Sequence, residues 1–543
     1  MKLTKYALLA ACTVTLASCS SDEPANNAAS DNQETATSTG FAQFDIKLPQ
    51  ASASRAIDSY QEGTADEYAV TNGKIIVFKE AGTEAEATFV CTAELLGMNW
   101  TSATTGEITT TSSTVAELSN INLTDASTYA AVIVLNYDNT FQFPSAGQTF
   151  GAWSKTPQNS GMILSKDGKS YLTMTNAAKY VSTSAEPAVL VQIDKSKIAQ
   201  SESAISGSAA TIHVQRATAK VTVITSSEAY TPTGAAYTSD KVTIDAWALD
   251  ITNKTTYPVQ VTEGLTTDYA GIWSEDRFFG GTQFARVFWA KDPNYSNNIL
   301  DQETTEGNFN VINASAITSA PAKAYCLENT FDVNHMMQGQ TTRVVLKGTY
   351  RPNGIPENEN FYKIGSSTQL WSQDNLQKQV LAKAQDVLQN DTDVTVDLGT
   401  VATAKGFHAL SEIDIKKADV RVSDDVYAKI ATELGLSNAS DKGIATYFEG
   451  QVYYIARIKH FGDADCPWNI GDPTYGGDNE KYLGRYGMVR NNWYELNVLS
   501  VSNPGSPDVP DIKHDTPDDE NDYYIQVEVN VLAWAKRVQN VDL

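Results

Sequence analysis

The end of the chain contains the pattern that most constrains its fold, a strict alternation of apolar and polar residues. Ile525, Val527, Val529 and Val531 are apolar, and each residue between them is polar. A two-residue period built from β-branched side chains predicts a strand with one buried face. The preceding segment, Ser502–Asp522, holds four prolines and seven acidic residues, which predicts an extended, charged tether without a core of its own.

A strand on a long tether has two possible partners. It can return to the open edge of its own sheet, or it can add to the sheet of another molecule. The sequence leaves both alternatives open.

The rest of the chain favours an all-β protein. Short alternating runs separated by polar turns recur along its 543 residues, a length that favours two domains with appendages over a single core. The formal net charge is −25. This charge argues strongly against a nucleic-acid partner, because phosphates are repelled by an acidic protein.

The first residues form a targeting segment. Lys2 and Lys5 precede an apolar run over 6–17, which is too short to span a bilayer. The run ends at Cys19 in a sequence that resembles a bacterial lipobox, in which the cysteine is acylated and becomes the first mature residue. Cys12 fits the same pattern but leaves too short an apolar region, and ordinary secretion with an incidental cysteine is the alternative.

A second alternating strand follows a polar spacer near the start. In Phe41–Pro49, Phe44, Ile46 and Leu48 share one face. Arg55 comes shortly after, among small residues that favour an exposed loop, where proteases cut. The spacing alone favours a plain solvated arginine over a cleavage site.

Further runs predict the strands and helices of the body. Helices are expected to begin near Asp374, with Gln377 completing a capping box, and at Ser423, ending at Gly435. The predicted strands cover 74–79, 129–136, 188–193, 211–225, 241–251, 341–350, 451–461 and 494–501.

No motif of catalysis, cofactor binding or metal binding is found. The five histidines are scattered without metal-ligand spacing, and nucleophile elbows and phosphate loops are absent from the sequence. A cation in the acidic loop near Asp463 and Asp465, and a sugar platform on tryptophans such as Trp247 and Trp289, are weaker alternatives. We expect no enzyme, no cofactor and no metal, with the remaining cysteines Cys91, Cys326 and Cys466 as small buried hydrophobes.

Taken in order, several of these segments resemble the Bacteroidales fimbrillins, the subunits of type V pili, and most closely the major subunits of the short fimbriae of porphyromonads. The resemblance runs the length of the chain. It is carried by the lipobox at Cys19, Leu48-Pro49 before Ser54-Arg55-Ala56, Gln215–Val221, Tyr325–Thr330 with Thr341–Val345, Val489–Tyr494, Val527–Trp534 and Val541–Leu543.

The resemblance implies a fold and a route of assembly. Fimbrillins have two tandem transthyretin-like β-sandwich domains, here with a few short helices inserted in the second. They are exported as lipoproteins to the outer membrane, and an arginine-specific protease then cuts, here between Arg55 and Ala56. The cut releases the blocking strand with Phe44, Ile46 and Leu48. The C-terminal strand of the next copy, with Ile525, Val527, Val529, Val531 and Trp534, is implied to replace it as donor.

The implied function is that of a major structural subunit of a cell-surface fimbrium, which supports adhesion and biofilm formation. Its implied partners are other copies of itself in a head-to-tail polymer, together with anchor and tip fimbrial subunits. A tip or accessory adhesin and a surface glycan-binding lipoprotein are the alternatives. The resulting division is a signal peptide 1–18, a propeptide 19–55, sandwich domains 56–207 and 208–501, a tether 502–522 and a donor strand 523–543.

Overall fold

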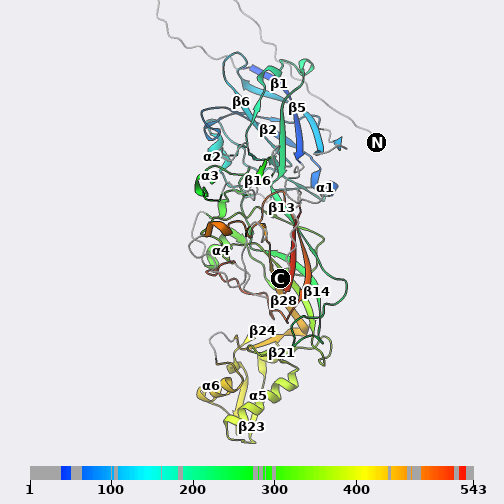
Figure 1. Ribbon diagram of the computed structural model, residues 1–543, viewed down its shortest axis with the longest axis vertical. Helices are drawn as coiled ribbons and strands as arrows, with labels where there is room; N and C mark the ends of the chain where they lie inside the picture. The colour runs from blue at the N-terminus through cyan, green and yellow to red at the C-terminus, as the bar shows by residue number, and fades with distance from the viewer. Residues whose placement is uncertain are drawn as a thin grey trace, which may run out of the picture.

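The molecule is elongated, with three lobes arranged one after another along its long axis (Figure 1). Strands dominate the described parts of the chain, with few helices, so the prediction of an all-β protein is confirmed. The finer prediction of two transthyretin-like sandwiches stays a prediction. This computed structural model describes residues 38–49, 64–98, 101–102, 108–159, 162–180, 187–272, 279–280, 285–287, 289–295, 301–437, 442–461, 466, 479–518 and 525–532.

The first lobe is a nine-stranded sheet that folds around a core. In this lobe β11 (Val191–Ile193) pairs with β6 beside the main path of the sheet. The order along that path is β3 (Thr88–Glu94), β2 (Gly73–Lys79), β6 (Tyr129–Leu135), β9 (Met174–Asn176), β12 (Ser208–Arg216), β1 (Ser38–Pro49), β5 (Ile108–Ile121) and β4 (Thr101–Ser102).

Two central strands of this sheet, β2 and β6, are buried on both faces. In β2, Ile75 and Val77 belong to the core of the first lobe, whereas Ile76 and Phe78 belong to a second core that reaches into the next lobe. Burial on both faces explains why these strands are continuous apolar runs in the sequence and not alternating ones.

The second lobe is a sandwich of two sheets around one core, with Val221 on one side and Leu346 on the other. One sheet has the order β19 (Ala324–Leu327), β13 (Thr218–Ile224), β29 (Trp493–Val501) and β30 (Ile525–Leu532). The other has the order β14 (Lys241–Asp250), β20 (Arg343–Arg351) and β28 (Gln451–Arg457).

The third lobe is inserted between β20 and β28 and has its own core. Its helices are α5 (Gln373–Val387) and α6 (Asp424–Glu433). Its strands are β21 (Phe361–Ile364), β22 (Leu370–Trp371), β23 (Val394–Asp397), β24 (Gly406–His408), β25 (Asp414–Lys417), β26 (Val420–Arg421) and β27 (Ile444–Tyr447).

Both helices lie where the sequence predicts them. Ser423 is the N-cap of α6, and Gly435 takes a left-handed φ of 75° just after its end. The capping box predicted for α5 is wrong. Ser372 is the N-cap there and accepts a hydrogen bond from the Asn375 N–H, while the Gln377 side chain donates to the Val396 carbonyl of β23.

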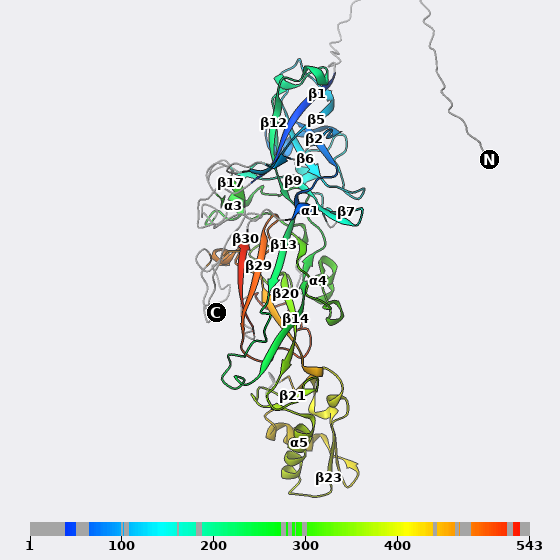
Figure 2. The same ribbon diagram turned by 90° about the vertical axis from the view of Figure 1, so that its right-hand side faces the viewer.

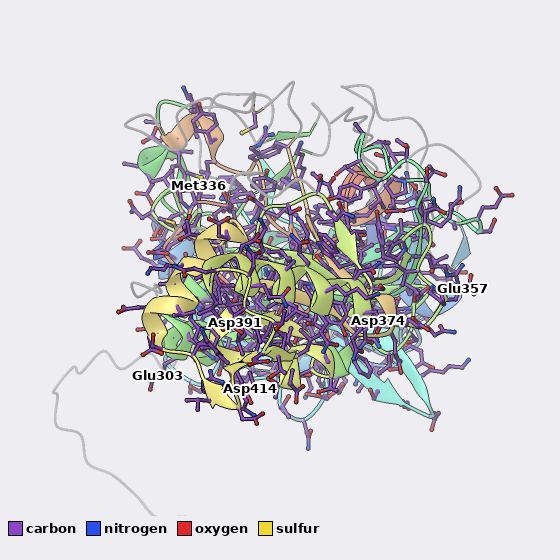
Figure 3. The ribbon with its side chains drawn as sticks, turned by 90° about the horizontal axis from the view of Figure 1, so that it is seen from below. Glu303, Met336, Glu357, Asp374, Asp391 and Asp414 are labelled. Carbon is purple, nitrogen blue, oxygen red and sulfur yellow. The ribbon has the colours of Figure 1, made fainter. Side chains whose placement is uncertain are left out.

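The free end of the third lobe carries acidic side chains whose charge is partly neutralised. In the view onto this end, Asp374, Asp391 and Asp414 are seen over the ribbon of the lobe (Figure 3). Asp391 forms an ion pair with Lys417 at 2.7 Å, and Asp414 forms one with Lys416 at 2.8 Å. We call this end the lower pole.

The first and second lobes share a hydrophobic core, so they are packed against each other. It joins Phe78 and Trp153 of the first lobe to Trp289, Phe331 and Tyr486 of the second. The short elements of the first two lobes are α1 (Ala65–Tyr68), α2 (Phe150–Ser154), β7 (Ile163–Lys166), β8 (Lys169–Leu172), β10 (Lys179–Tyr180), β15 (Thr252–Asn253), α3 (Leu265–Asp268), β16 (Phe279–Gly280), β17 (Ala285–Val287), α4 (Gln302–Asn308) and β18 (Phe309–Asn310).

The chain passes from the first sheet to the second at Ala217. The prediction of one strand over 211–225 is wrong in extent, because β12 pairs in the first sheet and β13 in the second. A division of the chain at 207/208 would separate β12 from its neighbours β9 and β1. The alternating pattern continues through both strands and does not show that their partners differ.

Candidate functional site

Strand β1, from the start of the described chain, lies inside the first sheet and not at its edge (Figure 2). It pairs antiparallel with β5 on one side and parallel with β12 on the other. Ala42, Phe44 and Ile46 are 0% exposed and belong to the core of the first lobe. The intervening residues Gln43 and Asp45 are half-buried, so the alternation seen in the sequence matches one buried face.

Removal of β1 would open a groove with two strand edges. The main-chain donors and acceptors of β5 and β12 that now face β1 would lose their partners. The space filled by Phe44 and Ile46 would also be opened to water, and the burial of these two side chains is worth roughly 3–6 kcal/mol. A replacement strand must therefore satisfy two edges and present apolar residues at every second position.

The direction of β1 follows from its parallel pairing with β12. β12 ends at Arg216, and the chain continues at once into the second lobe. β1 therefore begins at the free end of the first lobe, near Ser38, and runs toward the second lobe at Pro49. We call the end at Ser38 the distal pole.

One ionisable side chain of the groove lies next to β1. His213 of β12 is opposite Lys47 in the register of the two strands. Burial first, and then the positive charges of Lys47 and Lys179, lower the pKa of His213 from 6.5 to about 4. While β1 is in place, the imidazole is therefore neutral at neutral pH.

We expect the groove to hold β1 less tightly as the pH falls from 6.5 to about 4. In this window His213 stays neutral while it is buried beside Lys47, but it takes up a proton once β1 has left and the groove is open to water, so acid favours the released state. The whole shift corresponds to roughly 3 kcal/mol, which is the upper limit of the effect. The measurement is release of the β1 peptide from protein nicked between 50 and 63, followed by native mass spectrometry from pH 7.5 to 4.

The control for this prediction is His213→Gln, which cannot titrate. Its release curve should be flatter than that of the unchanged protein between the two pH limits. Equal slopes for the two proteins would contradict a role for His213.

A buried carboxylate fixes the segment that follows Arg55 to both lobes. Glu67 of α1 is 1% exposed. Its carboxylate forms ion pairs with Lys220 at 2.9 Å and Lys323 at 2.7 Å, and it accepts a hydrogen bond from the Tyr325 hydroxyl at 2.7 Å. The Arg216 side chain donates a hydrogen bond to the main-chain carbonyl of Glu67. Burial alone would raise the pKa of Glu67, but hydrogen bonds from Lys323, Tyr325 and Lys220 outweigh it and lower the pKa to about 2. Glu67 therefore remains charged, and the chain downstream of Arg55 stays attached if β1 leaves.

The C-terminal strand β30 lies at the edge of the second-lobe sheet. It pairs antiparallel with β29, from Ile525 opposite Val501 to Leu532 opposite Trp493. In the single chain the strand thus returns to its own sheet, the first of the two alternatives. Its place at an edge means that it can leave by breaking one ladder, whereas β1 is held by two.

The segment before β30 is more ordered than its composition predicts. Residues 502–518 contain bends and a turn, and they lie against the second and third lobes and are not a free tether. Asp508 pairs with Lys405 at 2.7 Å, and Asp518 is 0% exposed and accepts a hydrogen bond from Thr341. The expectation of a solvated tether fails because specific polar partners on the body offset the high charge of this segment.

Several predicted residues lie outside the described part of the chain. They are the lipidation residue Cys19, the cleavage residues Arg55 and Ala56, and Trp534. Leu48 and the donor residues of β30 are described in their main chain only. Their roles stay predictions.

The weaker alternatives gain little from the described residues. Trp247 and Trp289 are 2% and 1% exposed, so they are core residues and not a sugar platform. Cys91, Cys326 and Cys466 are buried. The described residues contain no cluster of three or more metal-ligating side chains. Asp463 and Asp465 of the acidic loop lie outside them.

Within the described ranges, the structure contains no helix with the length and apolarity needed to cross a membrane.

Sequence reasoning missed three parts of the site. Glu67 is one acid in a polar stretch, and His213 is one histidine in a strand, so neither carries a local signal. The ordered segment 502–518 was not predicted, because its prolines and acidic residues are typical of solvated linkers. In all three, the partners lie far away in the sequence.

Comparisons with known proteins identify one part of the chain. Residues 445–540 match the family model described as "Major fimbrial subunit protein type IV, Fimbrillin, C-terminal". This range contains β28, β29 and β30. No curated protein matches the chain.

Among solved structures, the chain is similar to a fimbrial assembly protein from Parabacteroides distasonis. The two share 11% identity over 62% of this chain and 94% of that chain, with a TM-score of 0.28.

Proposed function

We propose that this chain is a structural subunit of a cell-surface fimbrium that polymerises by exchange of strands. The observation that carries the proposal is the place of β1, a strand from the start of the chain, between β5 and β12. Loss of such a strand creates a groove that only another strand can fill. The match of residues 445–540 to the fimbrillin C-terminal family supports the same conclusion.

The C-terminal strand is the proposed replacement. Its apolar residues Ile525, Val527, Val529 and Val531 alternate with polar ones, as Phe44 and Ile46 do in β1. A strand with this pattern can pair with both edges of the groove through its main chain and fill the apolar pockets on one face. Exchange thus replaces one set of equivalent contacts by another, between two copies instead of within one.

The direction of β1 gives the direction of assembly. A donor strand with the same polarity as β1 enters the groove at the distal pole, because the other end of the groove faces the second lobe. The donor copy then lies beyond the distal pole of the acceptor, and its own groove is free for a third copy. Such a head-to-tail contact does not close on itself and produces a fibre.

The finer parts of the proposal concern export and maturation. The precursor is lipidated on Cys19 and held at the outer membrane, and an arginine-specific protease cuts after Arg55 to release β1. The two packed lobes correspond to the two transthyretin-like domains of fimbrillins. Anchor and tip fimbrial subunits are the proposed partners at the ends of the fibre. A shaft position is favoured over the tip, because a tip subunit needs no donor strand.

The deciding experiment is N-terminal sequencing of material sheared from the cell surface. We expect a start at Ala56, in high-mass oligomers that resist mild denaturation. A lipidated start at Cys19 in a monomer would contradict the proposal and would favour a permanently anchored surface lipoprotein.

A further inference from the structure

The segment 502–518, here called the strap, is fixed at its first half beside the third lobe. Ser506 and Tyr453 of β28 exchange two main-chain hydrogen bonds of 2.8 and 2.9 Å. The strap thereby covers part of the open edge of β28. Nearby, the Tyr447 hydroxyl donates to the Gly505 carbonyl at 2.9 Å, next to the ion pair of Asp508 with Lys405.

The second half of the strap is fixed near the junction of the first two lobes. Arg343 donates to the Pro510 carbonyl at 2.9 Å, and the Thr305 hydroxyl lies 2.9 Å from Nδ1 of His514. Main-chain bonds run from Gln338 to Thr516 and from Asp518 to Met336. Met336 itself belongs to the core shared by the two lobes.

The strap therefore runs from the third lobe up to the junction, away from the lower pole. This direction limits how far β30 can reach. Eight peptide units separate Pro517 from Ile525, which span at most about 29 Å when fully extended. β29 alone, with nine residues, is about 30 Å long, and the third lobe lies beyond its lower end.

A fibre built head to tail along the long axis places the distal pole of the acceptor at the lower pole of the donor. With the strap in place, β30 reaches only to the level of Val501, its partner in the single chain. With the strap detached, the 23 peptide units from Ser502 to Ile525 span up to about 83 Å. The attached length is used up along β29, whereas the detached length starts at the lower end of β29 and extends beyond it.

We propose that the strap is an intramolecular lock on assembly, and that it detaches from the second and third lobes before β30 can enter another copy. This inference rests on the proposed function. Assembly is then controlled at two places. The cut at Arg55 opens the acceptor groove, and release of the strap frees the donor strand. The contacts suit such a role because they are separate hydrogen bonds and an ion pair, with Val509 and Ile512 packed at the margins of two cores, so they can be broken one after another.

A reversible covalent lock tests the proposal. Met337 and Pro517 face each other as an antiparallel pair flanked by the two main-chain bonds named above. In such a pair the Cα atoms are about 4.5 Å apart, within the range of a disulfide. Protein with Met337→Cys and Pro517→Cys, oxidised before the cut at Arg55, should form no polymer after it, and reductant should restore assembly to the rate of unchanged protein.

Each single cysteine variant, treated with the same oxidant, controls for oxidation elsewhere and should polymerise normally. A second variant acts in the opposite direction. Ser506→Pro removes the N–H that bonds to Tyr453, so assembly after the cut should be several-fold faster.

The outcomes separate this inference from the function on which it rests. If the oxidised double variant polymerises as fast as unchanged protein, the lock is wrong while strand exchange stands. If neither the unchanged protein nor the reduced variant polymerises after the cut, the proposed function itself fails. Assembly is followed in each case by light scattering and electron microscopy.

Discussion

Cells that produce the Arg55→Ala variant are expected to export a folded precursor and to carry no fibres. β1 then stays between β5 and β12, where both of its edges are paired and Phe44 and Ile46 are fully buried. An incoming strand would have to displace a covalently attached one of high local concentration, which binding from solution cannot match. We expect complete loss of fibres, measured by electron microscopy and by the absence of high-mass ladders on gels.

The matched control places the recognition sequence of a different protease between residues 50 and 63 of the same variant. Added protease should restore assembly, which shows that the defect is the missing cut and not a misfolded subunit. Fibres of normal length on cells with Arg55→Ala alone would refute the mechanism.

Two carboxylates on the apolar face of β30 should have an effect of similar size. In the variant with Val527→Glu and Val529→Glu, each new carboxylate would enter an apolar pocket of the acceptor groove. Burial of an unpaired charge costs several kcal/mol, so we expect the affinity of the donor strand to fall at least about thousandfold. The variant should remain folded and should still accept a donor strand, and it should therefore end growing fibres.

The matched control carries the same charges on the other face, as Gln526→Glu and Asn530→Glu. It should polymerise, because these positions alternate with the apolar ones and face away from the pockets. The test is to add each cleaved variant to unchanged protein and to measure the length of the fibres. Equal fibre lengths with both variants would argue against β30 as the donor.

Some elements were predicted correctly from the sequence and others were not, and the difference has a physical reason. Strands such as β2, β6 and β20 were found from local apolar runs, and α6 was found from its cap at Ser423 and its stop at Gly435. These signals act within one turn or one strand. At the start of α5 only the capping residue was misassigned, because Ser372 and not Asp374 makes the local cap. The break at Ala217 was missed because it depends on pairing with strands that are distant in the sequence.

The parts of the candidate site divide in the same way. The sequence shows that Phe44 and Ile46 share a face, but not that the face closes a sheet between β5 and β12. It shows a histidine at 213 and a lysine at 47, but not that they are neighbours across a parallel ladder. It shows an acid at 67, but not that three side chains from the second lobe converge on it.

By itself the sequence determined the class of fold and the alternating period of the two terminal strands, and its net charge argues against a nucleic-acid partner. Only the tertiary structure decided where those strands lie, which groups surround them, and that the acidic, proline-rich tail is strapped to the body. A two-residue period defines which side of a strand is buried, but any complementary edge can meet it. The choice among edges is made by long-range packing, and it is this choice that turns an ordinary strand into one that can be exchanged.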